Sequence, residues 1–194
     1  YEKLFYPSLS INLYQPGFPF ITSSQIMGSP AVIDVNNDGS ENLIFGDYAG
    51  FIHVIDIDGQ ELDGFPYEIG DQIWGSPAVA DLENDGDLEI VIGSIDKKLY
   101  ILNTDGTMQA IYNTNKFLFA TPAIGNLDSD SDLEIVISGF SSSNKVFAIN
   151  PDGTSVDGYP VQIDEKVQRG VTLFDVNDNG KDDIVFGTDS ENLY

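Results

Sequence analysis

Oxygen-bearing side chains recur at a fixed spacing in four short acidic stretches of the chain. These stretches, here called loops 1 to 4, cover residues 34–42, 81–89, 126–134 and 175–183. In each loop, Asp, Asn or Glu occupies positions 1, 3, 5 and 9. The ten-residue windows that begin at position 1 hold 16 of the 32 Asp and Glu residues, so the acidic charge is concentrated in a small part of the chain.

This spacing is typical of a loop that wraps around a hard divalent cation. Calcium takes about six to eight oxygen ligands, and a tightly curled loop turns alternate residues toward its centre. Gly at position 6 of loops 1, 2 and 4 provides the sharp turn, and position 7 would offer only its backbone carbonyl. We therefore predict up to four calcium ions, one per loop. The predicted ligand positions are Asp34, Asn36, Asp38, Ser40, Asn42, Asp81, Glu83, Asp85, Asp87, Glu89, Asn126, Asp128, Asp130, Asp132, Glu134, Asp175, Asn177, Asn179, Lys181 and Asp183.

A helix–loop–helix calcium site of the EF-hand type begins in the same way and must be excluded. Its loop ends in a bidentate Glu at position 12 and lies between two helices. Position 12 is here Phe45, Ile92, Ile137 or Phe186, and each lies in a short apolar run typical of a strand. Position 9 must therefore close each site.

The four loops are not equivalent. Loop 3 begins with Asn126 and has Ser131 at position 6, where a left-handed backbone would cost about 1–2 kcal/mol. Loop 1 ends in the neutral Asn42, so loop 2 is the best calcium candidate. The alternative is that all four loops are metal-free turns, because Asp, Asn and Gly favour turns in any case. Four repetitions of one register favour calcium.

The loops belong to an internal repeat whose successive steps are 47, 45 and 49 residues. Gly-Ser-Pro-Ala-Val at 28–32 returns at 75–79, and related segments begin at 120 and 170. In the second repeat, apolar runs predict strands over 76–81, 88–93, 98–103 and 109–113, with a tight Asp105-Gly106 turn before the last. Four antiparallel strands in a unit of this length predict an all-β fold of β-propeller blades, rather than a sandwich that repeats by accident.

The repeat divides the chain into about four blades, of which three are complete. We assign the end of a preceding blade to 1–23, blade 1 to 24–70, blade 2 to 71–115, blade 3 to 116–165 and a partial blade 4 to 166–194. Three arrangements fit this division. The chain is part of a longer ring, or its N-terminal strands close a four-bladed ring, or its open sheet edges pair with other copies.

The repeats resemble the FG-GAP repeat, called the VCBS repeat in bacterial proteins, which builds the propeller head of integrin α chains. Ser-Pro-Ala-Val at 29–32 stands for the Gly-Ala-Pro element of the family, and 44–46, 91–93 and 185–187 stand for its Phe-Gly element. The resemblance covers about residues 24–194, and blade 3 departs from it at Ser138. The family implies secretion, calcium in the loops between the first and second strands of each blade, and ligand recognition on other surfaces.

Composition limits the partners and the chemistry. The net charge of −24 argues against nucleic acids and anionic membrane surfaces as partners. The chain has no Cys, which excludes disulfides and a Cys nucleophile, and no apolar run approaches membrane-spanning length. The single His, His53, lies between apolar neighbours and is predicted to be packed rather than catalytic.

A second candidate site precedes the first strand of each repeat. Met27, Trp74, Phe119 and Arg169 occupy equivalent positions, which a propeller places on the face opposite the acidic loops, near the central axis. Aromatic and Arg side chains there could stack on a sugar or grip an acidic peptide. The alternative is that the large apolar residues are wedges that pack adjacent blades, as most such residues do.

These features predict a non-catalytic, calcium-binding propeller module of a secreted or cell-surface protein, which acts in adhesion, ligand recognition or scaffolding. Its ligand would be a protein or a carbohydrate. One alternative is the propeller portion of a secreted carbohydrate-active lyase or hydrolase whose catalytic residues lie elsewhere. The other is a self-assembling structural repeat that associates through its open sheet edges.

Overall fold

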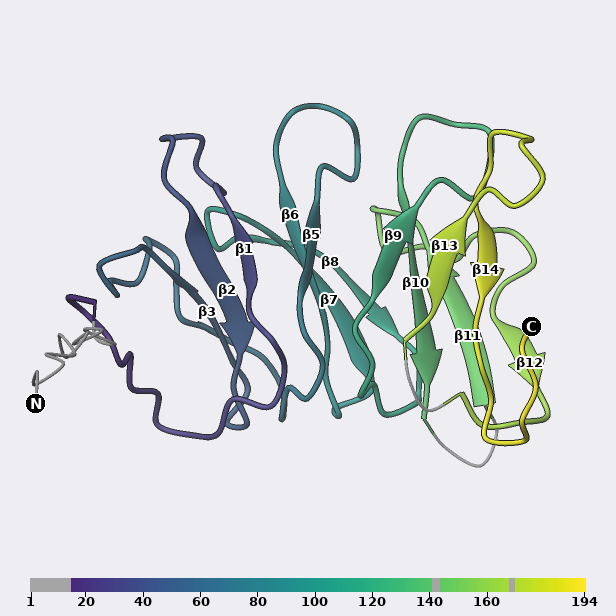
Figure 1. Cartoon of the computed structure of the whole chain (residues 1–194), viewed down its shortest axis with the longest axis horizontal. Helices are drawn as coiled ribbons and strands as arrows, with labels where there is room; N and C mark the ends of the chain where they lie inside the picture. Colours follow the sequence, from purple (N-terminus) through teal and green to yellow (C-terminus); the bar gives the residue numbers. More distant parts are fainter. Residues whose placement is uncertain (1–14, 141–143, 168–169) are drawn as a thin grey trace, which may run out of the picture.

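The chain forms a row of antiparallel sheets in the computed structural model, which describes residues 15–140, 144–167 and 170–194 (Figure 1). Three sheets have four strands, each paired in sequence order, and a fourth sheet has two. Within the described residues, no helix is long and apolar enough to cross a membrane.

Sheet 1 contains β1 (Ala31–Ile33), β2 (Asn42–Gly46), β3 (Phe51–Ile55) and β4 (Tyr67–Glu68). Sheet 2 contains β5 (Ala78–Ala80), β6 (Glu89–Gly93), β7 (Lys98–Asn103) and β8 (Met108–Asn113). Sheet 3 contains β9 (Ala123–Gly125), β10 (Glu134–Gly139), β11 (Asn144–Ile149) and β12 (Val161–Ile163). Sheet 4 contains β13 (Thr172–Phe174) and β14 (Asp183–Val185).

This architecture confirms the predicted all-β fold of propeller blades. The four predicted strands of the second repeat correspond to β5 to β8, with ends that differ by two residues or fewer. The predicted turn at Asp105-Gly106 is present, with Gly106 at φ 82°. In the partial fourth blade, the backbones of Phe186 and Tyr194 exchange two hydrogen bonds, so a third strand begins beside β14.

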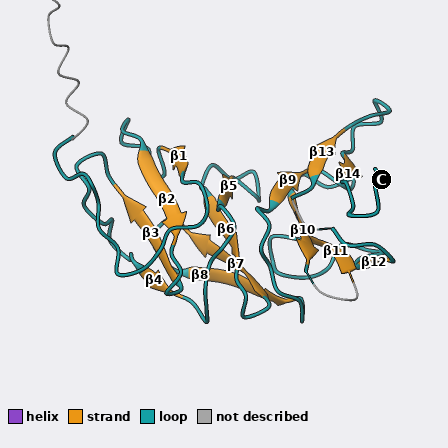
Figure 2. Ribbon diagram, turned by 60° about the horizontal axis from the view of Figure 1, so that its bottom comes forward, coloured by secondary structure: helices purple, strands orange, loops and turns teal. Residues whose placement is uncertain are grey.

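The sheets fan out so that their first strands lie side by side (Figure 2). β1 contacts β5, β5 contacts β9, and β9 contacts β13, as expected where blades meet near a common axis. β6 shows how the blades are joined. Ile90 and Ile92 pack in the core shared with blade 1, while Val91 points the other way into the core shared with blade 3. Because β6 is buried on both faces, its sequence is continuously apolar rather than alternating.

The same geometry separates the two candidate sites. Loops 1 to 4 join the first and second strands of their blades and project from one edge of the row, at the top of Figure 1. The segments that lead into β1, β5 and β9 run along the opposite edge. These segments lie in register, because Ser29 N donates to Ser76 Oγ and Ser76 N donates to Thr121 Oγ1.

Truncation of a residue between blades should strongly destabilise the fold. Ile92 has no exposed surface and packs against blade 1, so Ile92→Ala should lower the free energy of unfolding by about 2–5 kcal/mol, measured by denaturant titration. Ile111 on β8 is 49% exposed, and Ile111→Ala should cost less than about 1 kcal/mol. Equal losses in the two variants would contradict an interface between blades 1 and 2.

Candidate metal loops and an aromatic cavity

The residue at position 1 shapes loops 1, 2 and 4. In loop 2, Asp85 N donates to Asp81 Oδ1 at 2.9 Å and Gly86 N donates to Asp81 Oδ2 at 2.8 Å. Asp34 and Asp175 accept the same two bonds in their loops. Positions 4 and 6 of all three loops have positive φ, between 56° and 98°. The position 1 carboxylate therefore organises a tight curl from within the loop.

The side chain at position 9 closes the base of every loop with a hydrogen bond. One of its oxygens accepts a hydrogen bond from the backbone N–H at position 2, which joins the end of the first strand to the start of the second. Asn42, Glu89 and Glu134 at this position are at most 3% exposed. The pairs are Val35 N with Asn42 Oδ1, Leu82 N with Glu89 Oε2, Leu127 N with Glu134 Oε2, and Val176 N with Asp183 Oδ2.

Burial makes the two Glu residues at position 9 electrostatically costly. Burial raises the pKa of Glu89 to about 7, and although the hydrogen bond from Leu82 lowers it, the neighbouring carboxylates of Glu83 and Asp85 raise it further. Burial likewise raises the pKa of Glu134. Each of these groups would be relieved by a proton or by a cation placed in its loop.

The carboxylates converge most closely in loop 3. Asp128, Asp130 and Glu134 each place an oxygen within 4.8 Å of the other two, and the described residues contain no other such group of three His, Cys, Asp or Glu ligand atoms. In loop 2, Gln109 Nε2 donates to Glu83 Oε1 and so occupies one predicted ligand. The geometry therefore favours loop 3 over loop 2, which ranks first by sequence.

The strain expected at Ser131 is absent. Ser131 is not among the described residues with positive φ, so the sequence-based expectation of a left-handed serine is wrong. Because a Cβ disfavours that conformation, loop 3 takes another path, in which Asp130 N donates to Asp128 Oδ1. The bond from Asp132 N to Asp130 Oδ1 is common to all four loops. Asn126 Oδ1 is shielded from solvent and has no hydrogen-bond partner.

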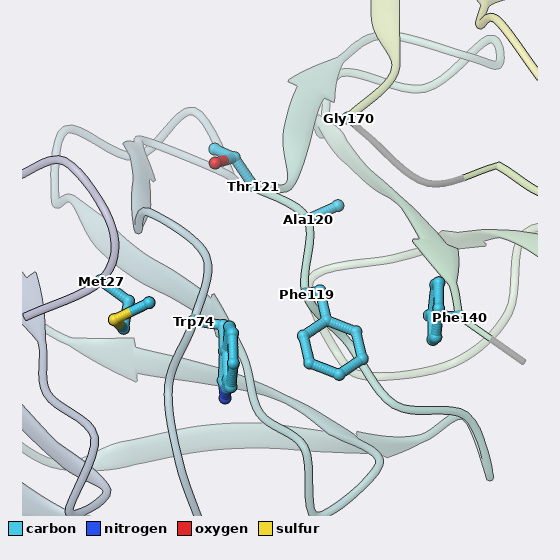
Figure 3. A pocket seen from close by; sticks show the side chains of 7 residues that line it. All are labelled: Met27, Trp74, Phe119, Ala120, Thr121, Phe140 and Gly170. Carbon is cyan, nitrogen blue, oxygen red and sulfur yellow. The ribbon is translucent and has the colours of Figure 1, made fainter.

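The predicted rim residues Met27, Trp74 and Phe119 meet at one cavity of about 570 Å³, shown in Figure 3. The Trp74 and Phe119 rings are 5.2 Å apart at 85°, and the Phe119 and Phe140 rings are 5.1 Å apart at 86°. Trp74 and Phe140 lie on either side of Phe119 (Figure 3). The aromatic side chains thus both pack between blades and line a cavity. Arg169 lies outside the described residues.

Phe140 is a lining residue that the repeat alone does not reveal. It follows β10 and is 39% exposed, with a backbone hydrogen bond to Phe117. Its signal in the sequence is an aromatic residue directly after the Gly that ends a strand, at a place where the other repeats have Asp47 and Ser94.

His53 is packed, as its neighbours predict. It is 6% exposed, stacks on Phe45 at 4.9 Å, and its Nδ1 lies 2.6 Å from Glu61 Oε1. Asp47 lies on the other side of the ring, with its Oδ2 3.6 Å from Nε2. No residue of loops 1 to 4 takes part in this cluster around His53.

Comparisons with known proteins identify the fold. Neither a protein-family model nor a curated protein matches the chain. Solved structures do. The C-terminal domain of PilY1 from Pseudomonas aeruginosa superposes with a TM-score of 0.60 at 19% identity, over 79% of this chain and 37% of that one. BamB from Moraxella catarrhalis gives 0.61 at 16%, over 88% and 46%. The V. cholerae biofilm matrix protein Bap1 gives 0.51 at 22%, over 88% and 36%.

These structures place the chain in the β-propeller fold class. At such low identity they carry the fold alone, and the chain spans less than half the length of each of the three. The resemblance to FG-GAP repeats, which no family model supports, stays an expectation.

Glu89 gives a pH-dependent test of loop 2. Without metal, the folded state keeps its proton up to about pH 7, whereas an unfolded Glu loses it near its ordinary value of 4.5, so the free energy of unfolding falls as pH rises between the two. Glu89→Gln keeps an acceptor for Leu82 N and removes the charge. Thermal unfolding in chelator should show similar stabilities near pH 4.5 and a more stable variant at pH 8. With calcium the order should reverse, because a ligand charge is lost.

The control for this test is Glu68→Gln, which removes an equally negative but exposed side chain on β4. It should show neither the pH-dependent gain nor the reversal. If Glu89→Gln behaves as Glu68→Gln does, the buried carboxylate carries no electrostatic cost.

Proposed function

We propose that the chain is a calcium-stabilised, non-catalytic β-propeller module that binds a protein or carbohydrate ligand outside the cell. The observation that carries the proposal is the set of four loops in one register along one edge of the fold, each closed by a side-chain oxygen at position 9. A single acidic turn would have little meaning, but four equivalent ones support a common ligand.

Charge balance supports a divalent cation in these loops. The buried carboxylates of Glu89 and Glu134 lie among further carboxylates, and Lys181 is the only basic residue within the four loops. Taking anionic groups out of water without a compensating charge is costly. Calcium suits these loops better than magnesium, because it accepts more oxygen ligands in a less rigid geometry.

Two observations support an extracellular setting. Modular calcium sites of moderate affinity, with a Kd of about 10⁻⁴–10⁻³ M, are typical of extracellular proteins. Four loops that end within nine residues, three of which place neutral Asn among their predicted ligands, fit that range. In addition, one structural neighbour, Bap1, is described as a biofilm matrix protein.

The aromatic cavity is the surface that supports recognition. Met27 and Phe140 are 46% and 39% exposed, and they flank the half-buried Trp74 and Phe119. Exposed aromatic rings of this kind offer flat apolar faces to a sugar ring or to an apolar side chain. The cavity lies at the edge of the blades opposite the acidic loops, so a ligand there would not compete with calcium.

Calcium should raise the thermal stability of the protein. At a free concentration of 100 times Kd, each site contributes about 2.7 kcal/mol, and each kcal/mol raises the Tm of a domain of this size by about 2–4 °C. Thermal unfolding would be followed in excess chelator, in millimolar calcium and in millimolar magnesium. A rise of several degrees in calcium and a smaller rise in magnesium are expected. No rise in calcium would reduce the loops to metal-free turns.

The cavity makes a second prediction about ligand binding. On a panel of immobilised polysaccharides and extracellular matrix proteins, the calcium-loaded protein should be retained on at least one without cleaving it. Trp74→Ala should abolish retention, because it removes the largest ring of the cavity. Ile57→Ala, which removes a 45% exposed apolar side chain away from the cavity, should not. Release of cleavage products would instead support a carbohydrate-active enzyme.

A further inference from the structure

We propose that Asp182 of loop 4 supports the metal site of loop 3 by positioning Asn126, so that binding of an ion there is coupled to the contact between blades 3 and 4. This inference rests on the proposed binding of calcium by the loops. It assigns to the site a residue from a different repeat, which the equivalence of the repeats does not suggest.

Asp182 reaches across the boundary between the two blades. Asn126 N donates to Asp182 Oδ2 at 3.1 Å, and Asp182 N donates to Asn126 O at 2.6 Å. Asn126 is position 1 of loop 3, so the carboxylate lies beside the position that carries a charge in loops 1, 2 and 4. The backbone bond holds Asp182 beside Asn126, and the bond from Asn126 N holds its carboxylate there.

The charge at position 8 of a loop can be compared with the charge at position 1 of the preceding loop. Position 8 of loop 2 is Leu88, and the preceding loop 1 begins with Asp34. Position 8 of loop 3 is Leu133, and the preceding loop 2 begins with Asp81. Leu133 N donates to Leu82 O, which places it against loop 2. Of the three loops that follow another loop, only loop 4, which follows the neutral Asn126, has an acidic residue at position 8, Asp182; loop 1 also has an acid there, Glu41. The carboxylate missing from loop 3 is therefore replaced from the next blade.

Gly125 makes room for this carboxylate. A Cβ at residue 125 would clash with Asp182 Oδ2, so a side chain there would displace the carboxylate from this position. The equivalent residues in the other repeats, Ile33, Ala80 and Phe174, all have side chains. Two departures from the repeat, at 125 and 126, thus lie at the contact with Asp182.

Two further observations indicate that loop 3 takes a ligand. Asn126 Oδ1 is a carbonyl oxygen that is closed off from solvent and has no hydrogen-bond partner, which is costly unless a cation or donor approaches it. In the same loop, Asp128, Asp130 and Glu134 have oxygens within 4.8 Å of one another. An ion held by these groups would be balanced by Asp182, which is a positioning residue because it acts through Asn126.

Calcium titration calorimetry on matched variants tests this inference. The binding step that disappears in Asp128→Asn identifies loop 3. Asp182→Asn should weaken that step about tenfold, a difference of about 1.4 kcal/mol, because it removes one nearby charge. Glu41→Gln removes a charge at the same position 8 in loop 1 and should leave the step unchanged. The double variant Asn126→Asp with Asp182→Asn returns the charge to position 1, as in loop 2, and should restore the affinity.

The outcomes separate the two proposals. If the unmodified protein binds no calcium, the proposed function fails. If it binds calcium but Asp182→Asn weakens the loop 3 step no more than Glu41→Gln, the assignment of Asp182 is overturned. A lower Tm of Asp182→Asn in chelator with an unchanged loop 3 affinity would also overturn it, because Asp182 would then be only a strut between blades.

Discussion

The fold depends on one side-chain hydrogen bond that is repeated in every described blade and is buried in blades 1 and 2. The side chain at position 9 lies under its loop and accepts the backbone N–H at position 2, which fixes the end of the first strand against the start of the second. In blades 2 and 3 this acceptor is a buried Glu, and burial of a carboxylate opposes folding unless a cation is near. The same interaction that positions the strands therefore leaves a buried carboxylate that a proton or a cation would relieve.

Burial of the sheets on both faces determines where function can lie. β6 and β10 contribute adjacent residues to different inter-blade cores, so their side chains are committed to packing. Only the two edges of the row remain available, where loops and strand connections project (Figure 1). One edge carries the acidic loops and the other carries the aromatic cavity, which explains why a single repeat presents two chemically opposite surfaces.

The sequence predicts what a single repeat contains and misses what arises between repeats. The strands of the second repeat follow from the positions of apolar residues and turns, since these are local signals. The rim residues Met27, Trp74 and Phe119 also follow, because they recur at one position. The altered path of loop 3 does not, since it depends on how Ser131 avoids a left-handed backbone.

The contact between Asp182 and Asn126 shows which sequence signal could have predicted a contact between blades. It joins residues 56 positions apart, and no pattern within one repeat reports it. Aligned against the other repeats, however, Gly125 and Asn126 depart from the common residue types, and Asp182 differs from Leu88 and Leu133. Residues that break a repeat together are therefore candidates for contact between neighbouring units.

The two edges are mechanically connected through very short strands. Trp74 precedes β5 by four residues, and Asp81 follows β5 directly, so six residues, about 23 Å of extended backbone, separate Trp74 from loop 2. β5 also contacts β1 and β9. A metal that fixes loop 2 would therefore restrict the strand that carries Trp74, and the register between Ser29, Ser76 and Thr121 would transmit that restriction to neighbouring blades. Calcium bound at one edge, as proposed, would thus limit the freedom of the aromatic rings at the other and reduce the entropy lost when a ligand binds there.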